Sequence, residues 1–317
     1  MGQGERRGFM SIVTVFFQML ALLIMIGVGF FAARTGMLDA HTNQQMSHMI
    51  VLIFNPLLIV SNAIGAAGQI SSAAMGKVAL IACGMFLFFI VCGMLLSPLF
   101  ERTDLQQRKI FQTMFVFSNL GFIGIPVVSS ILGAQYVVYV TEFVLIYTLV
   151  FYTYGIALMD GHFSAASVKA MVNPGMVCGI AALGIILFEI PLPGFLKTSI
   201  TYLGGVASPM ALVAVGFTLA HADLKTVFGQ PRLYVFSVVK LLVLPLLLLP
   251  ILRMVIKDAP LAAVCMIMFG MPIGNMPLIL GNERGIDGTT CGAAIILTTI
   301  LCVFTVPVLM AAVQSFV

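Results

Sequence analysis

Long apolar runs separated by short polar segments make up most of the chain. A bilayer core about 30 Å thick is crossed by roughly 20 apolar helical residues, and ten runs of about this length are present. The alternating pattern of a half-buried β-strand does not fit them. We therefore predict an all-α polytopic membrane protein with ten transmembrane helices. In chain order, spans 1 to 10 are Ser11–Ala33, Gln45–Ile64, Ala74–Phe100, Lys109–Leu132, Tyr136–Met159, Met171–Phe188, Leu196–Ala220, Arg232–Ile256, Pro260–Leu280 and Gly288–Val313.

The composition agrees with this pattern and excludes several classes of protein. Apolar residues make up 61% of the chain and charged residues 8%, whereas a soluble domain has about 45–50% and about 25%. Too little charge remains to cover a water-facing surface, which excludes a soluble enzyme and a nucleic-acid binder. The cysteines show no CxxC spacing, so neither a metal site nor a disulfide framework is expected. The motifs of intramembrane proteases are also absent, and no enzymatic activity is expected.

The two halves of the chain resemble each other. A shift of 153 residues places Asn55-Pro56 of span 2 on Ser208-Pro209 of span 7, and Asn119–Gly121 of span 4 on Pro272–Gly274 of span 9. Each half would contain five spans, so the second half would enter the membrane from the opposite face. Such a 5+5 inverted repeat is typical of secondary transporters.

These halves define the predicted domain organisation and orientation. The first five-helix repeat is expected at residues 1–160 and the second at 161–317, with residues 1–9 disordered or an upstream extension. Without Arg6 and Arg7, the side that holds the termini carries four Lys or Arg and the other side eight. Because Lys and Arg in short loops favour the cytoplasm, both termini are predicted to lie outside it.

Spans 4 and 9 contain helix-breaking residues at corresponding places. The sequence is FSNLGFIGIPVVSS in span 4 and MFGMPIGNMPLIL in span 9. Proline and glycine disrupt the helical hydrogen bonds, and backbone groups freed at membrane depth need partners from protein or from water in a cavity. We therefore predict that both helices are broken. The disrupting residues are Gly121, Gly124 and Pro126 in span 4, and Pro272, Gly274, Asn275 and Pro277 in span 9.

The residue types at these breaks favour an anionic ligand. Asn119 and Asn275 offer amide donors and acceptors, and a half-helix beginning at Pro126 or Pro272 would present an electropositive N-terminus. Spans 4 and 9 contain no Asp or Glu, which a cation exchanger would need there. No metal and no cofactor is expected. The predicted substrate-binding residues are Asn119, Gly121, Pro126, Pro272, Gly274 and Asn275.

Two charged residues lie inside predicted spans: Glu142 in span 5 and Lys240 in span 8. Either would cost a few kcal/mol if it faced lipid unpaired. They are candidate coupling groups, and the alternative for each is a structural role in which the side chain reaches the headgroup region.

The interrupted spans carry the resemblance to a known family. The pattern Asn-x-Gly-Phe-x-Gly-x-Pro from Asn119 to Pro126 resembles the auxin efflux carrier family of membrane transporters, and Pro272–Asn275 with Gly285–Asp287 is similar to its second signature. The resemblance implies a scaffold of helices 1, 2, 6 and 7 and a transport domain of helices 3–5 and 8–10, in which broken helices 4 and 9 cross. It also implies that the Asn and Pro residues of both broken helices belong to the substrate site. Arg284 departs from the family pattern, in which many members have an aromatic residue before the late Gly-x-Asp.

Taken together, these features predict a secondary transporter of a small organic anion. The resemblance implies a mono- or dicarboxylate (malonate-, malate- or auxin-like), and the absence of a long central hydrophilic loop favours a short prokaryotic form in the bacterial inner membrane. The expected partners are this anion and the lipid bilayer, without nucleic acid; a homodimer through the scaffold helices and coupling to H⁺ or Na⁺ are further hypotheses. The alternative is a cation/proton exchanger or a bile-acid-type sodium symporter of the same architecture.

Overall fold

The computed structural model describes residues 12–66, 72–161, 174–221, 224–282 and 284–314. The predicted extension at residues 1–9 lies outside these ranges. Within them every regular element is helical, and the strand-like pairing is one isolated antiparallel bridge between Ser118 and Ile273. The prediction of an all-α protein is confirmed.

Seven helices of the described chain are long and apolar enough to cross a membrane, which supports a multi-pass membrane protein. Three shorter apolar helices accompany them, at Leu120–Leu132, Pro174–Leu187 and Ala259–Phe269. The ten-span count and the 5+5 repeat stay predictions. The seven long helices are Val13–Arg34, Ala40–Gly65, Ala74–Phe100, Ala134–Asp160, Gly194–Ala220, Pro231–Val255 and Thr289–Gln314.

In the first half of the chain, π-helical turns interrupt several of the helices. Side chains set some of the helix starts: Asp39 accepts a hydrogen bond from the Thr42 backbone N–H, and Asp104 accepts bonds from the backbone N–H groups of Gln106 and Gln107. The elements are α1 (Ile12–Arg34), α2 (Ala40–Met49), η1 (Ile50–Phe54), α3 (Asn55–Ala66), α4 (Ser72–Phe100), α5 (Leu105–Val116), η2 (Leu120–Gly124), α6 (Ile125–Leu132), η3 (Ala134–Tyr136), α7 (Val137–Val150), η4 (Phe151–Gly155) and α8 (Ile156–Asp160).

The second half of the chain likewise consists of helices, one of them interrupted by the π-helical turn η5. Asp258 caps α16 by accepting a hydrogen bond from the Leu261 backbone N–H. The elements are α10 (Pro174–Leu187), α11 (Gly194–Gly205), α12 (Ala207–Ala220), α13 (Leu224–Phe228), α14 (Pro231–Val238), η5 (Val239–Val243), α15 (Leu244–Val255), α16 (Ala259–Phe269), α17 (Met276–Asn282) and α18 (Thr289–Gln314).

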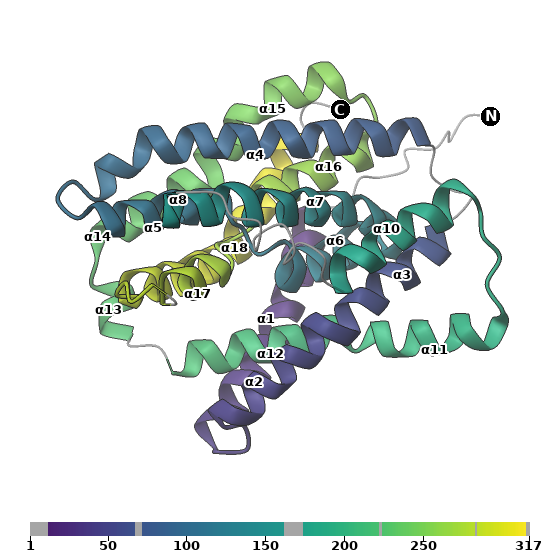
Figure 1. Cartoon of the computed structure of the whole chain (residues 1–317), viewed down its shortest axis with the longest axis horizontal. Helices are drawn as coiled ribbons and strands as arrows, with labels where there is room; N and C mark the ends of the chain where they lie inside the picture. The colour runs from purple at the N-terminus through teal and green to yellow at the C-terminus, as the bar shows by residue number, and fades with distance from the viewer. Residues whose placement is uncertain (1–11, 67–71, 162–173, 222–223, 283, 315–317) are drawn as a thin grey trace.

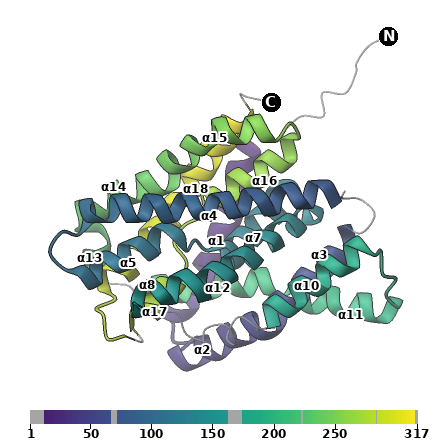
Figure 2. The same cartoon turned by 45° about the horizontal axis from the view of Figure 1, so that its top comes forward.

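The helices form a bundle in which α4 runs lengthwise beneath α15 on one side, and α11 and α12 lie on the opposite side (Figure 1). Helix α1 packs on α12 and α18, α3 packs on α10 and α11, and α4 packs on α5 and α7. Helix α18 passes through the middle of the bundle (Figures 1 and 2) and is the most buried of the seven long apolar helices, with 78% of its apolar window buried. The centre of the protein therefore lies where α18 meets α16, α1 and the short helices of span 4.

Glycines allow α1 and α12 to touch backbone to backbone. A Cβ atom added at Gly29 of α1 would lie 2.0 Å from the Val213 carbonyl oxygen, and one added at Gly216 of α12 would lie 2.0 Å from the Ile26 carbonyl oxygen. Close approach through small residues is the usual way in which membrane helices pack. This contact fixes the distance between α1 and α12.

Gly29→Ala is expected to separate α1 from α12 and to destabilise the protein by about 1–3 kcal/mol, the usual cost of overpacking. The matched control is Gly27→Ala in the same helix, where an added Cβ meets nothing within 4 Å. That change should be neutral or stabilising by up to about 1 kcal/mol, because alanine favours the helix. Thermal unfolding in detergent measures both variants. Equal midpoints for the two would contradict the contact described here.

Candidate functional site

Two non-helical segments lie side by side inside the bundle. The first break, residues 117–119, separates α5 from η2, and the second break, residues 270–275, separates α16 from α17. The bridge between Ser118 and Ile273 joins them as a short antiparallel pair. The structure thus brings together the two stretches, one in span 4 and one in span 9, that contain the Gly, Asn and Pro residues expected to disrupt the helices.

Backbone hydrogen bonds between the breaks replace those that a continuous helix would form. The Asn119 backbone N–H donates to the Pro272 carbonyl oxygen at 2.7 Å, and the Gly274 backbone N–H donates to the Phe117 carbonyl oxygen at 2.9 Å. A Cβ atom at Gly274 would lie 3.1 Å from the Ser118 carbonyl oxygen, so glycine permits this close approach. These four freed backbone groups are therefore satisfied by protein, as burial requires.

The predicted half-helix start at Pro272 is wrong, whereas Pro126 is the second residue of α6, which directly follows the π-helical turn η2. The helical parts that follow the breaks begin at Leu120 and Met276 instead. In span 4 the Asn119 side-chain Oδ1 accepts a hydrogen bond from the Phe122 backbone N–H at 3.0 Å, which caps the helix well before Pro126. Pro272 lies within the second break, where its carbonyl oxygen pairs with the first.

A small cavity beside the breaks is lined by both asparagines, Asn119 and Asn275. Asn119 is 6% exposed. Its Oδ1 accepts the hydrogen bond from the Phe122 backbone N–H, so its amide Nδ2 is the side-chain group that can donate to a ligand. The open space is about 20 Å³, little more than the 10–15 Å³ that one water needs. A carboxylic acid would fit only after the walls move apart.

The remaining cavity walls come from α1, α12 and α18, and no residue that lines the cavity is charged. Thr218 and Thr299 contribute hydroxyl groups, but Thr218 donates to the Ala214 carbonyl oxygen at 3.2 Å and Thr299 to that of Ile295 at 2.7 Å. Their protons are therefore committed to their own helices. These wall residues were missed from the sequence, because an apolar helical run does not show which face meets a distant break. The apolar lining includes Leu23, Ile26, Leu219, Ile295, Ile296 and Ile300.

The other four predicted site residues do not line the cavity. Pro272 and Gly274 belong to the second break and are buried. Pro126 is buried at the start of α6, and Gly121 lies in η2, where an added Cβ would be 3.8 Å from the Asn55 Nδ2 atom. The structure thus separates two asparagines with side chains at the cavity from four residues that shape the backbone around it.

Lys240, in η5, is fully buried against the first break. Its Nζ donates to the Phe115 carbonyl oxygen and to the Ser118 hydroxyl at 2.7 Å, and it lies 4.1 Å from the centre of the Phe89 ring. In a continuous helix the Phe115 carbonyl would accept from Asn119, four residues later. Lys240 therefore supplies the donor that the break removes. Its burial excludes the alternative in which the side chain reaches the headgroups.

Glu142, in α7, is 4% exposed, and its Oε2 atom has no hydrogen-bond partner among the described residues. Among the ion pairs of the described residues there is none between Glu142 and Lys240. Glu142 and Lys240, the two charged residues inside the predicted spans, therefore do not pair with each other.

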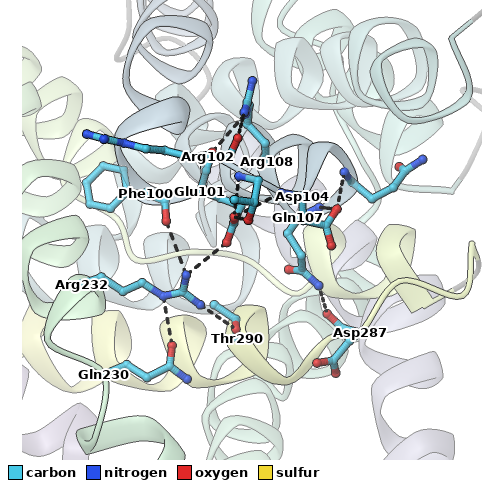
Figure 3. Close-up of polar contacts among 12 residues, drawn as sticks. Phe100, Glu101, Arg102, Asp104, Gln107, Arg108, Gln230, Arg232, Asp287 and Thr290 are labelled. Carbon is cyan, nitrogen blue, oxygen red and sulfur yellow. Dashed lines mark hydrogen bonds and ion pairs between the residues drawn. The ribbon is translucent and has the colours of Figure 1, made fainter.

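A polar belt joins several helix ends at one end of the bundle (Figure 3). We define it by Glu101, Gln107, Arg232, Asp287 and Thr290. Arg232 Nη1 lies 3.2 Å from Glu101 Oε2, and Arg232 Nη2 donates to the Thr290 hydroxyl at 3.4 Å. Gln107 Nε2 donates to the Asp287 carbonyl oxygen at 2.9 Å. The belt links the α4–α5 loop with the starts of α14 and α18.

Within the belt, hydrogen bonds stabilise the charged form of Glu101. The hydroxyl and backbone N–H of Thr103 donate to its carboxylate, and with the Asp104 backbone N–H they lower the pKa of Glu101 to about 2. Arg284, the residue that departs from the family pattern, pairs through its guanidinium with the Asp160 carboxylate at 2.6 and 3.0 Å. This ion pair joins the α17 end to the α8 end.

Comparison with known proteins supplies the family context. A family model described as membrane transport protein matches residues 14–166 and 163–310. An uncharacterized transporter of Methanocaldococcus jannaschii is 22% identical over 290 residues, covering 88% of this chain and 92% of that protein. One of Methanothermobacter thermautotrophicus is 22% identical over 293 residues, covering 91% and 95%. A Rhizobium meliloti protein named "Putative malonate transporter" is 31% identical over 138 residues, covering 43% and 42%.

Proposed function

The chain belongs to the membrane transport protein family, and from this premise we propose that it is a secondary transporter that moves a small organic anion by alternating access. The observation that carries this proposal is the cavity lined by Asn119 and Asn275 where the two breaks meet. Two amide groups at an otherwise uncharged site can donate hydrogen bonds to a carboxylate. The printed name of the Rhizobium relative supports a carboxylate as the class of substrate.

The proposed architecture has ten spans in two inverted five-helix repeats, 1–160 and 161–317, with broken helices 4 and 9 crossing at the cavity. Seven long and three shorter apolar helices support this count. The proposed scaffold consists of helices 1, 2, 6 and 7, and the proposed transport domain of helices 3–5 and 8–10. The cavity is lined by residues of α1 and α12, which belong to the proposed scaffold, and by residues of α18 and the two breaks, which belong to the proposed transport domain. It therefore lies on the proposed boundary.

Alternating access requires the transport helices to move together. The polar belt and the Arg284–Asp160 pair support such a unit, because they join the ends of spans 3, 4, 5, 8, 9 and 10. The small size of the cavity supports a motion of α18 away from α1 and α12 before a substrate can enter. Residues at that boundary, rather than within the belt, would then change neighbours during transport.

The remaining proposals concern location, assembly and coupling. The distribution of Lys and Arg supports a cell-membrane protein with both termini outside the cytoplasm. A homodimer through the scaffold is supported by α11, which is exposed along most of its length. Glu142, with its unpaired Oε2, favours a second candidate function, a cation or proton exchanger or a sodium symporter, in which Glu142 carries the ion.

Reconstitution into liposomes tests the proposed function. We expect saturable uptake of a radiolabelled carboxylate that is stimulated by unlabelled carboxylate on the opposite side, since such exchange distinguishes a carrier from a channel. Liposomes without protein are the control. Flux of sodium or protons that needs no organic substrate would contradict the proposal and favour the exchanger.

A further inference from the structure

We infer that a second cavity, at the end of α15, binds the phosphate group of an anionic phospholipid while an acyl chain of the same lipid lies against the apolar wall of the cavity. The lipid is distinct from the transported substrate, and its binding does not depend on the proposed function. Three features of the described residues point to it: the size of the cavity, the order of apolar and cationic residues along its wall, and the exposed apolar surface beside it.

The second cavity is large enough for part of a lipid molecule. Its open space is about 320 Å³, against about 20 Å³ at the breaks, and cavities that bind small molecules measure about 300–1,000 Å³. It lies where α15, α16 and α18 pack on one another (Figures 1 and 2). Ala262 of α16 and Val313 of α18 contribute to its wall, and the other lining residues belong to α15 or directly follow it.

The position of this cavity along span 8 is the membrane surface. The helix Pro231–Val255 is long and apolar enough to cross the bilayer, and the cavity is lined by residues of its last two turns and by the two residues that follow. The end of such a helix meets the headgroup region, where the phosphate groups of the lipids lie. At the start of the same span, Arg232 joins α14 to Glu101 and Thr290. Side chains therefore hold spans 8 and 10 together at one end, whereas their other ends surround a cavity.

Apolar and cationic residues follow one another in a definite order along the cavity wall. Leu249, Leu252, Arg253 and Ile256 all line the cavity, and their spacing of three and four residues places them on one face of α15. Leu249 and Leu252 are buried, whereas Arg253 and Lys257 are exposed. Along the helix axis Leu249 lies about 6 Å nearer the middle of the span than Arg253. Apolar residues inside and cations at the rim correspond to the acyl chain and the phosphate of a phospholipid.

The charge of this cavity suits a phosphate. Among the described residues that line it none is acidic, and Arg253 and Lys257 supply two positive charges. Asp258, the next residue along the chain, does not line the cavity, and its Oδ1 caps α16 by accepting a hydrogen bond from the Leu261 backbone N–H at 2.9 Å. A guanidinium can bind two phosphate oxygens at once, and an ammonium adds a compact charge. Basic pockets between membrane helices are typical binding sites for acidic lipid headgroups.

The surface beside the cavity favours a lipid over a phosphate ion from water. Ile251 and Met254, in the same two turns of α15, are 58% and 85% exposed. On a helix that crosses the bilayer, exposed apolar side chains contact lipid acyl chains. A phospholipid can therefore enter the cavity from the bilayer and bury apolar surface against Leu249 and Leu252. A free phosphate ion gains nothing from these side chains.

Thermal unfolding of the full-length protein in detergent, with and without added lipid, tests this inference. We expect dioleoylphosphatidylglycerol to raise the melting temperature in a saturable manner, because a ligand that binds only the folded protein stabilises it. Dioleoylphosphatidylcholine has the same acyl chains without a net charge and should have a much smaller effect. Inorganic phosphate and glycerophosphate lack acyl chains and should not raise the melting temperature. Equal stabilisation by these water-soluble phosphates would exclude a lipid as the source of the phosphate group.

A double variant tests the location of the site. Arg253→Gln with Lys257→Gln removes both charges of the cavity, and we expect the phosphatidylglycerol concentration at half of the full stabilisation to rise at least about tenfold, or about 1.4 kcal/mol. Lys77→Gln with Lys197→Gln is the matched control, because it removes two exposed cations outside the cavity. The control should need the same concentration as the wild type. Each protein is compared with its own melting temperature without lipid, so that a change in intrinsic stability does not affect the result.

Two outcomes would overturn the lipid site. The first is an unchanged phosphatidylglycerol concentration in the cavity variant. The second is an equal rise in the control variant, which would mean that anionic lipid is attracted by surface charge in general. Neither outcome affects the proposed function, which uptake into liposomes tests separately.

Discussion

Asn119→Asp is expected to weaken carboxylate binding at least about 100-fold, or about 2.7 kcal/mol, while the protein stays folded. The aspartate keeps an oxygen in place to accept the bond from the Phe122 backbone N–H, so the helix cap is preserved. It loses both amide donors and adds a negative charge at the site. A bound carboxylate would then meet a like charge where it had met a donor.

Comparison of three variants in calorimetry and thermal unfolding separates binding from folding. Asn119→Ala removes the cap as well as the donors, and should lose about 1 kcal/mol of stability in addition to its affinity. Asn43→Asp makes the same chemical change in the first turn of α2, away from the cavity, and should bind like the wild type. Wild-type affinity in Asn119→Asp would contradict the assignment of this side chain.

Lys240→Met is expected to weaken carboxylate binding at least about tenfold. We expect the free energy of unfolding to change by less than this loss of binding free energy. The methionine leaves the Phe115 carbonyl and the Ser118 hydroxyl without the donor that they have in the wild type, so the Asn119 turn is held less firmly. The loss of these bonds is partly offset, because a buried charge is no longer desolvated. The variant also removes the positive charge of Lys240, so a bound carboxylate loses its electrostatic attraction to that charge.

Lys240→Gln separates these two effects, because it keeps a donor and removes the charge. We expect an affinity between those of the wild type and Lys240→Met. Lys197→Met, at an exposed position on α11, is the matched control and should change neither affinity nor melting temperature. If Lys240→Met has a lower melting temperature but wild-type affinity for the carboxylate, the role of Lys240 is structural only.

Much of the fold was predictable because membrane burial acts on long runs of sequence. The apolar runs predict helices, and the Gly and Pro residues around Asn119 and Pro272 indicate where two of them are interrupted. The start of the helix after the first break was not predictable from proline, because a single side chain, Asn119, caps it upstream of Pro126. Local hydrogen bonding decided a boundary that residue preferences had placed elsewhere.

The surroundings of the site were less predictable because distant segments form them. Lys240 bonds to Phe115 and Ser118, which precede it by more than 120 residues, and the sequence alone left its role open. The threonines and aliphatic residues of α12 and α18 carry no local signal of a cavity. Arg284 was recognised as a departure from the family pattern, but its ion pair with Asp160 depends on how α17 meets α8.

Solid-state NMR in lipid measures whether the side chains of Asn119 and Asn275 contact the bound carboxylate directly. Protein labelled with ¹⁵N at asparagine would be saturated with a monocarboxylate labelled with ¹³C at its carboxyl carbon. A hydrogen bond of ordinary length places that carbon within about 4 Å of each amide nitrogen. The expected result is dipolar coupling to two side-chain nitrogens, one of which disappears in Asn119→Asp at an acid concentration that still saturates this variant. A bound acid without coupling to either asparagine would contradict it.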